Sequence, residues 1–380
     1  MKRTDLLAAL RSLALFSVLF LFPSCLDDDS LEQADTYEGT FEACWQTLDE
    51  RYCYFDEKKL DWDAVYRFYK PLVRDSVKTQ FQLFSMLDQM LSLLRDGHVN
   101  LYSPFNTARY QYWYQNYPVN FDANLLDRYY LGANYAMTSG MKYGTFPTDS
   151  IGYIRYSSFD SSLGATNLDY IMAVLRRCNG LIIDIRNNGG GALTNAVALA
   201  QRFAARKTLY GYMRHKTGPG HNQFSEPEPL YVEPLADRYG WDPSERPVVI
   251  LTNRHCYSSA NQFVQIMQSL DGQLFTDSLG QQHPAMIKLC GDRTGGGSGM
   301  PFESVLPNGW TLRFSACPMY DAKMQSSESG IDPTPELRVD MDSLSAYEHH
   351  RDDIIEAARA YILNNTRMVR KKQQNEENPS

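Results

Sequence analysis

Ser258 stands in a segment whose residue types could carry out acyl transfer. The segment reads HCYSSANQF and follows the apolar run PVVILT, so Ser258 falls where an expected strand passes into an expected helix. A serine at that junction could present its hydroxyl at the edge of a sheet. The N–H of Ser259 and the helix dipole would then stabilise negative charge beside it. Serine at this position also commonly caps a helix, and the segment taken alone favours the cap.

Two further segments could supply the other parts of such a site. His98 lies in LRDGHV, after a helix that we expect to end at Gly97, and a histidine there could act as a general base. In DIRNNGGG a buried strand runs into Gly189, Gly190 and Gly191, whose backbone N–H groups could hold a phosphate or an oxyanion. Acyl transfer needs a nucleophile, a base and oxyanion donors, and the three segments contain one of each.

The glycine-rich turn does not match the common nucleotide-binding signatures. Neither GxxxxGK[ST] nor GxGxxG occurs there, which disfavours a nucleotide site. An alternative is a tight strand-to-helix turn that needs glycine only for steric reasons. Asp184 and Arg186 beside it are predicted to be scaffold residues, which fix the turn through an ion pair or hydrogen bonds.

The elements that must position these residues indicate an α/β core over residues 151–366. Fully apolar strands alternate with amphipathic helices, which predicts a mainly parallel sheet covered on both faces. The expected strands are 151–156, 180–186, 247–252 and 287–291, and the expected helices are 163–178, 192–205 and 258–270. A hairpin turning at Asn308-Gly309 and a closing helix with Ile354, Ile355, Ala358 and Ile362 complete the core.

The remaining chain divides by pattern into three parts. Residues 36–100 carry apolar residues at helical spacing and are predicted to form an N-terminal helical subdomain packed on one side of the core. Residues 101–150, rich in Tyr, Asn and Gly, are expected to be an insertion of short strands and loops. The charged stretch 367–380 is predicted to be a disordered tail.

The first 24 residues resemble a bacterial signal peptide. Lys2 and Arg3 lead into the apolar run LALFSVLFLF, which is about half the ~20 residues needed to span a bilayer and stops just before Cys25. The cysteine predicts lipidation at Cys25, with 25–35 as a tether. An exported lipoprotein on the outer membrane, facing the periplasm or the cell surface, would follow. The alternative is an ordinary secretory signal in which Cys25 is incidental.

The composition disfavours several classes of partner. Lys and Arg number 37 against 45 Asp and Glu, for a net charge of -8, and no basic patch or stripe stands out. We therefore expect no nucleic acid and no membrane contact beyond the lipid anchor. The other six cysteines form no CxxC pair, so a zinc site is not expected, and they are predicted to be mostly buried free thiols with one disulfide as an alternative. No metal and no cofactor is implied.

Three motifs together resemble a known family. LRDGHVNL, GLIIDIRNNGGG and VVILTNRHCYSSANQF, in this order, resemble the C-terminal-processing (tail-specific) serine peptidases, which include the tricorn protease core and the interphotoreceptor retinoid-binding repeats. The resemblance covers roughly residues 40–340. It implies a ClpP/crotonase-like βαβ superhelix with a helical N-terminal part. The acidic run after Cys25 resembles the tether of Bacteroidetes surface lipoproteins.

The resemblance implies that Ser258 is the nucleophile and distinguishes between two possible bases. One branch of the family uses a lysine from a GxxTxGKG segment, and Gly297 stands at that position, so a Ser/Lys dyad is not expected. The tricorn-like branch uses a histidine that aligns with His98. In that branch a serine precedes the histidine and links it to a glutamate, whereas Gly97 stands here.

The acid partner of His98 therefore stays open between candidates. Asp332 in SGIDPTPEL and Glu328 just before it could orient the imidazole. Asp96 is a further candidate, although a structural role in its loop is the stronger interpretation.

The sequence and its resemblance together predict a serine endopeptidase that cleaves peptides or unfolded segments outside the cytoplasm. The N–H groups of Ser259 and of Gly190 or Gly191 would form the oxyanion hole. Only 85 residues separate His98 from Asp184, and no carboxylate-binding loop is visible, so no complete PDZ domain is expected. The alternative is a non-catalytic lipoprotein that binds a peptide or an apolar ligand on the same fold. Export disfavours an acyl-CoA enzyme of the crotonase kind, and the oligomeric state is not indicated.

Overall fold

The computed structural model describes residues 34–235, 239–277 and 279–377. The predicted signal peptide, the predicted lipidation at Cys25 and most of the predicted tether lie outside the described residues.

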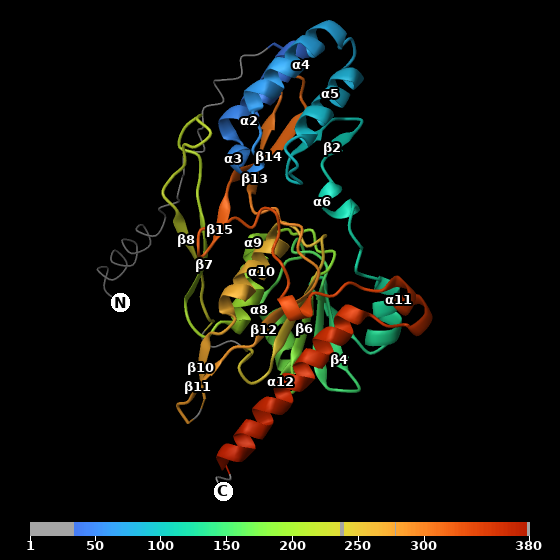
Figure 1. The fold of residues 1–380 in the computed structure, drawn as a ribbon, viewed down its shortest axis with the longest axis vertical. Helices are drawn as coiled ribbons and strands as arrows, with labels where there is room; N and C mark the ends of the chain where they lie inside the picture. The colour runs from blue at the N-terminus through green and yellow to red at the C-terminus, as the bar shows by residue number, and fades with distance from the viewer. Residues whose placement is uncertain (1–33, 236–238, 278, 378–380) are drawn as a thin grey trace, which may run out of the picture.

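A six-stranded mixed sheet forms the centre of the molecule, with the strand order β12-β9-β6-β5-β4-β3 (Figure 1). Its strands are β3 (Ala136–Thr138), β4 (Met141–Phe146), β5 (Ile151–Tyr156), β6 (Leu181–Asp184), β9 (Val248–Thr252) and β12 (Ile287–Gly291). The strands β5, β6, β9 and β12 run parallel, and β4 and β3 add an antiparallel edge. The prediction of a mainly parallel sheet is confirmed.

Helices cover both faces of this sheet. The helices α8 (Ala165–Leu175), α9 (Leu193–Ala200) and α10 (Ser259–Leu270) lie on one face, and α12 (Asp353–Glu377) lies on the other. Because side chains alternate along a strand, Ile183 and Ile250 pack in the hydrophobic cluster on the face covered by α8, α9 and α10. Ile182 and Val249 pack in the cluster on the face covered by α12. This explains why the parallel strands read as continuous apolar runs.

The N-terminal helices form a separate layer at one end of the molecule (Figure 1). They are α2 (Tyr37–Arg51), α3 (Phe55–Lys58), α4 (Trp62–Ser76) and α5 (Gln80–Ser92). The N-cap side chains of Thr36, Asp61 and Thr79 accept backbone N–H groups at the starts of α2, α4 and α5. The helical character predicted for residues 36–100 is confirmed for these elements. Helix α5 ends at Ser92 rather than at Gly97, because the chain turns and Arg95 adopts a left-handed conformation with φ 49°.

A four-stranded sheet joins this helical layer to the rest of the chain. Its order is β13-β14-β1-β2, from β1 (Asn100–Tyr102), β2 (Thr107–Arg109), β13 (Met300–Val305) and β14 (Thr311–Cys317). The hairpin β13–β14 turns at Asn308-Gly309 as predicted, with Gly309 at φ 81°. Leu312 and Phe314 of β14 pack in the same cluster as Leu87 of α5. The hairpin therefore lies outside the central sheet, and its apolar face packs against the N-terminal helices.

The smaller elements complete the fold. The segment predicted as short strands and loops also contains helices: α6 (Tyr112–Gln115), α7 (Ala123–Leu125) and the π-helical η1 (Leu126–Leu131). A three-stranded sheet is formed by β7 (Thr208–Met213), β8 (Glu228–Val232) and β15 (Met319–Asp321), and a small hairpin by β10 (Leu274–Thr276) and β11 (Gln282–Pro284). The others are η2 (Gln201–Phe203), η3 (Pro335–Leu337) and α11 (Ser343–His349).

The C-terminal part of the chain differs from its prediction. Helix α12 continues to Glu377, so the expectation of disorder from residue 367 is wrong as far as 377. The physical reason is that Lys, Arg, Gln and Glu, which dominate this stretch, are good helix formers despite their charge.

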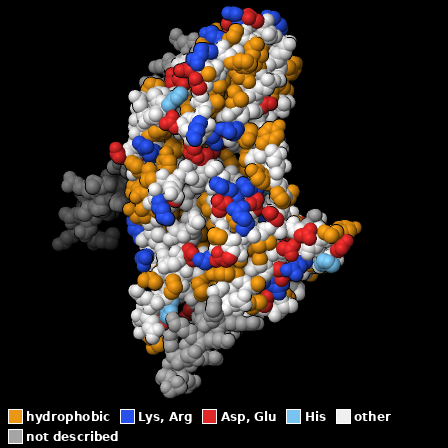
Figure 2. All heavy atoms as spheres, viewed as in Figure 1, with side chains coloured by type: hydrophobic (Ala, Val, Ile, Leu, Met, Phe, Trp, Pro, Cys, Tyr) orange, Lys and Arg blue, Asp and Glu red, His pale blue; other side chains and the backbone are white. Residues whose placement is uncertain are grey.

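The six cysteines in the described part of the chain are free and buried, so no disulfide forms among them. Within residues 34–377, gaps excepted, no helix is both long and apolar enough to cross a membrane. Figure 2 shows basic side chains beside acidic ones on the visible face rather than gathered into a patch of one sign.

Candidate active site

A cavity of ≈ 580 Å³ opens where three loops meet at the carboxyl ends of neighbouring strands. These loops follow β6, β9 and β12, which are adjacent in the sheet. Backbone hydrogen bonds tie them together: Tyr257 N–H donates to Asn188 O at 3.1 Å and Ser258 N–H donates to Gly296 O at 2.8 Å. Sites of open α/β sheets form at this edge, because the strand ends leave backbone and side chains free to face a ligand. The structure thus brings Ser258 and the glycine turn together as predicted.

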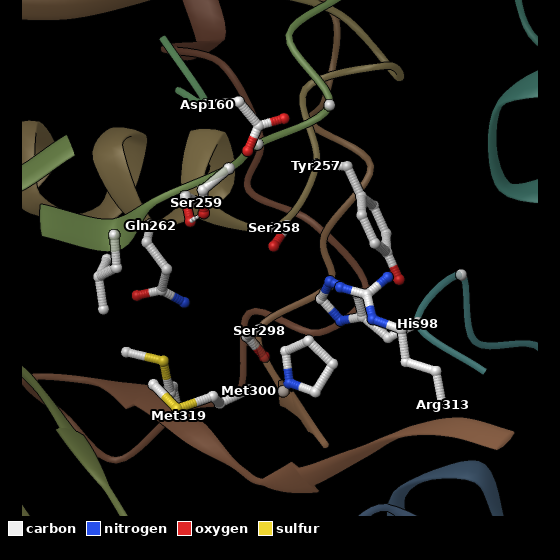
Figure 3. A pocket seen from close by; sticks show the side chains of 18 of the residues that line it. His98, Asp160, Tyr257, Ser258, Ser259, Gln262, Ser298, Met300, Arg313 and Met319 are labelled. Carbon is white, nitrogen blue, oxygen red and sulfur yellow. Dashed lines mark hydrogen bonds between the residues drawn. The ribbon is translucent and has the colours of Figure 1, made fainter. Parts of the chain in front are cut away.

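Ser258 has a backbone conformation that only a strongly determined site tolerates. It stands between β9 and α10 with φ 57° and ψ -124°, a region that costs free energy for a residue with a Cβ. Its hydroxyl makes no cap bond to α10 and has no hydrogen-bond partner among the described residues, so the helix-cap interpretation is wrong. Figure 3 shows this hydroxyl directed into the cavity. The side chain is therefore positioned for chemistry rather than for helix capping.

The glycine turn packs directly against the serine. A Cβ on Gly190 would lie 2.7 Å from Ser258 Cβ, and Gly190 has φ +102°, so only glycine fits there. The Gly190 N–H donates to Asn188 Oδ1 at 2.9 Å and is not free for an oxyanion, which corrects the expectation for this residue. The N–H groups of Ser259 and Gly191 make no hydrogen bond in the described part of the chain and border the cavity.

His98 borders the same cavity from the N-terminal side. The residue is 3% exposed, and its ring lies edge-on to the Tyr257 ring, with centroids 5.0 Å apart. Burial lowers the pKa of His98 to about 4; the negative charge of Asp96 opposes this and the positive charge of Arg313 adds to it. Its Nδ1 has no hydrogen-bond partner, and no hydrogen bond joins the ring to Ser258. The imidazole is thus neutral at pH 7 and faces the cavity beside the serine (Figure 3).

Asp96 holds the histidine loop in place. The residue is 1% exposed. Its carboxylate accepts four hydrogen bonds, which come from Tyr52 Oη (3.0 Å), Ser315 Oγ (2.8 Å), Tyr257 Oη (3.3 Å) and the His98 N–H (2.7 Å). Burial alone would raise its pKa, but Lys58, His98 and these hydrogen bonds lower it. Asp96 thus stays ionised and fixes the backbone of His98, which agrees with the structural role expected for it.

The other two acid candidates lie in different surroundings. Asp332 is exposed, pairs with Arg293 at 3.1 Å and with Arg338, and does not line the cavity, so its prediction as the acid partner of His98 is wrong. Glu328 is buried and accepts from Lys58 Nζ at 3.0 Å and from Ser298 N–H at 2.9 Å. Burial and the nearby charge of Asp96 raise the pKa of Glu328 to about 8. Neither carboxylate bonds to the His98 ring.

Two glycines near the site leave room for the Tyr257 ring. A Cβ on Gly97 would lie 2.8 Å from Tyr257 Oη and 2.8 Å from Trp113 Nε1, and a Cβ on Gly297 would collide with the same tyrosine ring. Gly297 also has φ +74°. The lysine of the Ser/Lys branch could not occupy this position without moving Tyr257.

Asp184 and Arg186 fix the start of the glycine turn through an ion pair, as predicted. Arg186 is fully buried and pairs with Asp184 Oδ2 at 2.6 Å and with Asp352 Oδ2 at 2.8 Å. Tyr153 Oη also donates to Asp184 Oδ2 at 2.7 Å. The network ties β6 to the start of α12, and none of these side chains lines the cavity.

The structure adds cavity residues that the sequence analysis did not identify. Arg313 of β14 lies beside His98 and has no ion-pair partner among the described residues. Gln262 of α10, Met300 and Met319 line the opposite side. Among these residues, only Gln262 could have been identified from the sequence, because it is a polar residue one helical turn after Ser258 on a buried helix.

Comparisons with known proteins identify relatives of this chain. The sequence profile of peptidase family S41 matches residues 150–337, and that of the tricorn protease C1 domain matches residues 33–92. The crystal structure of a presumed peptidase from Parabacteroides merdae is 45% identical, with a TM-score of 0.75. The match covers 85% of this chain and 96% of that chain. No curated protein matched this chain.

More distant structures share the fold. Mature CPAF in complex with lactacystin has a TM-score of 0.65 at 11% identity, covering 87% of this chain and 99% of that chain. The tricorn protease has a TM-score of 0.50 at 14% identity, covering 87% of this chain and 37% of that chain. At these identities the likeness establishes the fold, a ClpP/crotonase-like core with a helical N-terminal part.

Proposed function

This chain belongs to peptidase family S41, a family of serine peptidases, and from that premise we propose that it is a serine endopeptidase with Ser258 as nucleophile and His98 as general base. Its substrates are peptides or unfolded protein segments. The observation that carries the proposal is the conformation of Ser258, a non-glycine residue at φ 57° whose hydroxyl is unbonded and faces the cavity. A strained serine at a strand-to-helix turn serves nucleophilic catalysis, because the turn exposes Oγ at the edge of the sheet.

In this mechanism Ser258 Oγ attacks the scissile carbonyl carbon and His98 accepts its proton. The oxyanion of the tetrahedral intermediate receives hydrogen bonds from the N–H groups of Ser259 and Gly191. The positive end of α10 adds to this stabilisation. The imidazolium then gives its proton to the leaving amine, and water hydrolyses the acyl-enzyme by the same steps.

Asp96 supports His98 in two ways in the proposal. Its hydrogen bond to the His98 N–H fixes where the ring stands, and its negative charge lowers the free energy of the imidazolium that forms during attack. We assign Asp96 as a positioning residue. No metal or cofactor takes part in the proposed steps.

The experiment that tests the proposal compares wild type with Ser258→Ala and His98→Ala. Wild type should hydrolyse an unfolded protein substrate and react with a fluorophosphonate probe. Ser258→Ala should lose both activities, and His98→Ala should lose most of both with its fold retained by circular dichroism. Unchanged labelling of Ser258→Ala would exclude Ser258 as the nucleophile.

One observation favours a second candidate function. No hydrogen bond joins His98 to Ser258 in this structure, and His98 Nδ1 is unpartnered. A protein that keeps the cavity but binds a peptide or an apolar ligand without cleaving it would show the same separation. This candidate predicts that wild type binds peptides, fails to react with the probe and leaves its substrates intact.

The place of action is part of the proposal as well. We propose that the chain is exported and anchored through a lipid on Cys25, which the sequence pattern before that residue supports. Cells expressing the full chain and fed a radiolabelled fatty acid should incorporate label into wild type and not into Cys25→Ala. Equal labelling of the two would refute the anchor and leave the peptidase assignment untouched.

A further inference from the structure

Gln262 is a buried amide at the cavity with neither polar atom satisfied. It lies one turn after Ser258 on α10, where its N–H donates to Ser258 O at 3.0 Å. The residue is 3% exposed, and neither Nε2 nor Oε1 of its side chain has a hydrogen-bond partner among the described residues. Leaving both amide atoms unpaired in the folded state costs free energy. Such a group in a native fold calls for a specific partner.

The position of Gln262 identifies which part of a substrate could be that partner. Figure 3 shows its amide and His98 on opposite sides of Ser258. The base delivers its proton to the leaving amine, so the leaving part of the substrate lies on the side of His98. Gln262 therefore faces the acyl part, the residue whose carbonyl carbon is attacked by Ser258.

The walls around Gln262 restrict the chemistry of that residue further. Met300 and Met319 line the same side of the cavity and offer adaptable apolar surface. The charged groups that border the cavity are Asp160 and Arg313. Arg313 stands with His98, and Asp160 stands beyond Ser258 in Figure 3, away from the two methionines. An ionised side chain would have no counter-charge beside the methionines, whereas an uncharged one with an apolar stem would fit.

We propose that Gln262 is a specificity-determining residue and selects a substrate residue with a neutral carboxamide, glutamine, on the acyl side of the scissile bond. The proposal rests on the proposed peptidase function. A carboxamide is both donor and acceptor, so it can exchange two hydrogen bonds with Nε2 and Oε1 of Gln262, while its methylene stem packs on Met300 and Met319. A site with unpaired polar atoms rejects ligands that cannot pair them.

Gln265 provides a matched control on the same helix. It is also a buried glutamine, but its Nε2 donates to Tyr210 O at 3.2 Å and to Tyr320 O at 3.1 Å, and its Oε1 accepts from Ser327 Oγ at 2.8 Å. It does not line the cavity. Gln265→Met therefore removes satisfied structural bonds, whereas Gln262→Met removes unsatisfied atoms. The first should lower the midpoint of thermal unfolding and the second should leave it unchanged or raise it.

The kinetic test uses pairs of internally quenched peptides that differ only in Gln or Met on the acyl side of the cleaved bond. Wild type should give a kcat/KM roughly 10- to 100-fold higher for the Gln peptide. Gln262→Met should abolish this ratio, and Gln265→Met should retain it. An equal loss on both peptides in Gln262→Met would overturn the proposal, because it would mean that Gln262 binds the peptide backbone.

A binding test separates this proposal from the proposed function. Ser258→Ala is titrated by calorimetry with N-acetyl-Ala-Ala-Gln and N-acetyl-Ala-Ala-Met, which are the acyl-side products of such peptides. The Gln peptide should bind about 10-fold more tightly, and the added change Gln262→Met should remove the preference. Equal affinities would overturn the proposal even if wild type is an active peptidase. If the protein bound the Gln peptide more tightly but cleaved no peptide and did not react with the fluorophosphonate probe, only the peptidase function would be refuted.

Discussion

The unusual pKa of His98 leads to a prediction in which activity and stability change together with pH. Burial lowers this pKa from 6.5 to about 4. At pH 5.5 about nine-tenths of an ordinary histidine carries a proton, whereas nearly all of His98 is still neutral and able to act as a base. The acidic limb of the kcat/KM profile should therefore fall at about pH 4 rather than near pH 6.5.

The same shift has a consequence for folding. Between pH 6.5 and about 4 the unfolded chain binds a proton that folded His98 does not bind, so stability present at pH 7 is lost as the pH falls through this range. A difference of about 2.5 pKa units corresponds to a loss of about 3 kcal/mol by pH 4. The variant His98→Gln lacks the titrating ring and should not show this part of the loss.

Urea unfolding of wild type and His98→Gln at pH 7, 5.5 and 4.5 measures the stability difference, and a kcat/KM profile measures the acidic limb. Arg313→Gln removes a positive charge that lowers the pKa of His98, so it should move the limb to higher pH. An acidic limb near pH 6.5, together with the same pH dependence of stability in His98→Gln as in wild type, would refute the reasoning.

Three further predictions concern residues around the site. Asp332→Ala should leave kcat/KM unchanged and the free energy of unfolding within about 0.5 kcal/mol, because Asp332 is exposed and away from the cavity; a large drop in kcat/KM would contradict this. Arg186→Met should cost about 3–5 kcal/mol in urea unfolding, since it leaves two buried carboxylates without their cation. Gly297→Ala should cost roughly 1–3 kcal/mol, through the clash with Tyr257 and the positive φ. If Gly297→Ala had the same midpoint of thermal unfolding as wild type, the Tyr257 ring would move freely and this prediction would be wrong.

Much of the fold and the centre of the site could be predicted because local patterns determine them. Apolar strands and amphipathic helices have their own periods, and the parallel order of the core strands follows from their alternation. Ser258 and the glycine turn were placed together because each follows a parallel strand, and such strands end at one edge of the sheet. The role of His98 as the base could be predicted only from the resemblance to the family, since nothing in the sequence of its loop places it at that edge of the sheet.

The remaining features depend on tertiary contacts that no local pattern encodes. Asp332 was a candidate from its sequence segment alone, but its side chain is exposed and pairs with two arginines. The choice between Gly190 and Gly191 as a donor depends on one hydrogen bond from Gly190 to Asn188. Arg313 reaches the cavity because β14 pairs with β1, a strand more than 200 residues earlier in the chain.

The central claim, that Ser258 attacks a carbonyl with the help of His98, is tested most directly by trapping the acyl-enzyme. Wild type is mixed with an activated ester of a peptide at low pH, quenched, digested and examined by mass spectrometry. We expect an acyl group on the peptide that contains Ser258, absent in Ser258→Ala and strongly reduced in His98→Ala. An acyl group on another residue, or none in wild type while the same sample hydrolyses peptides, would contradict it.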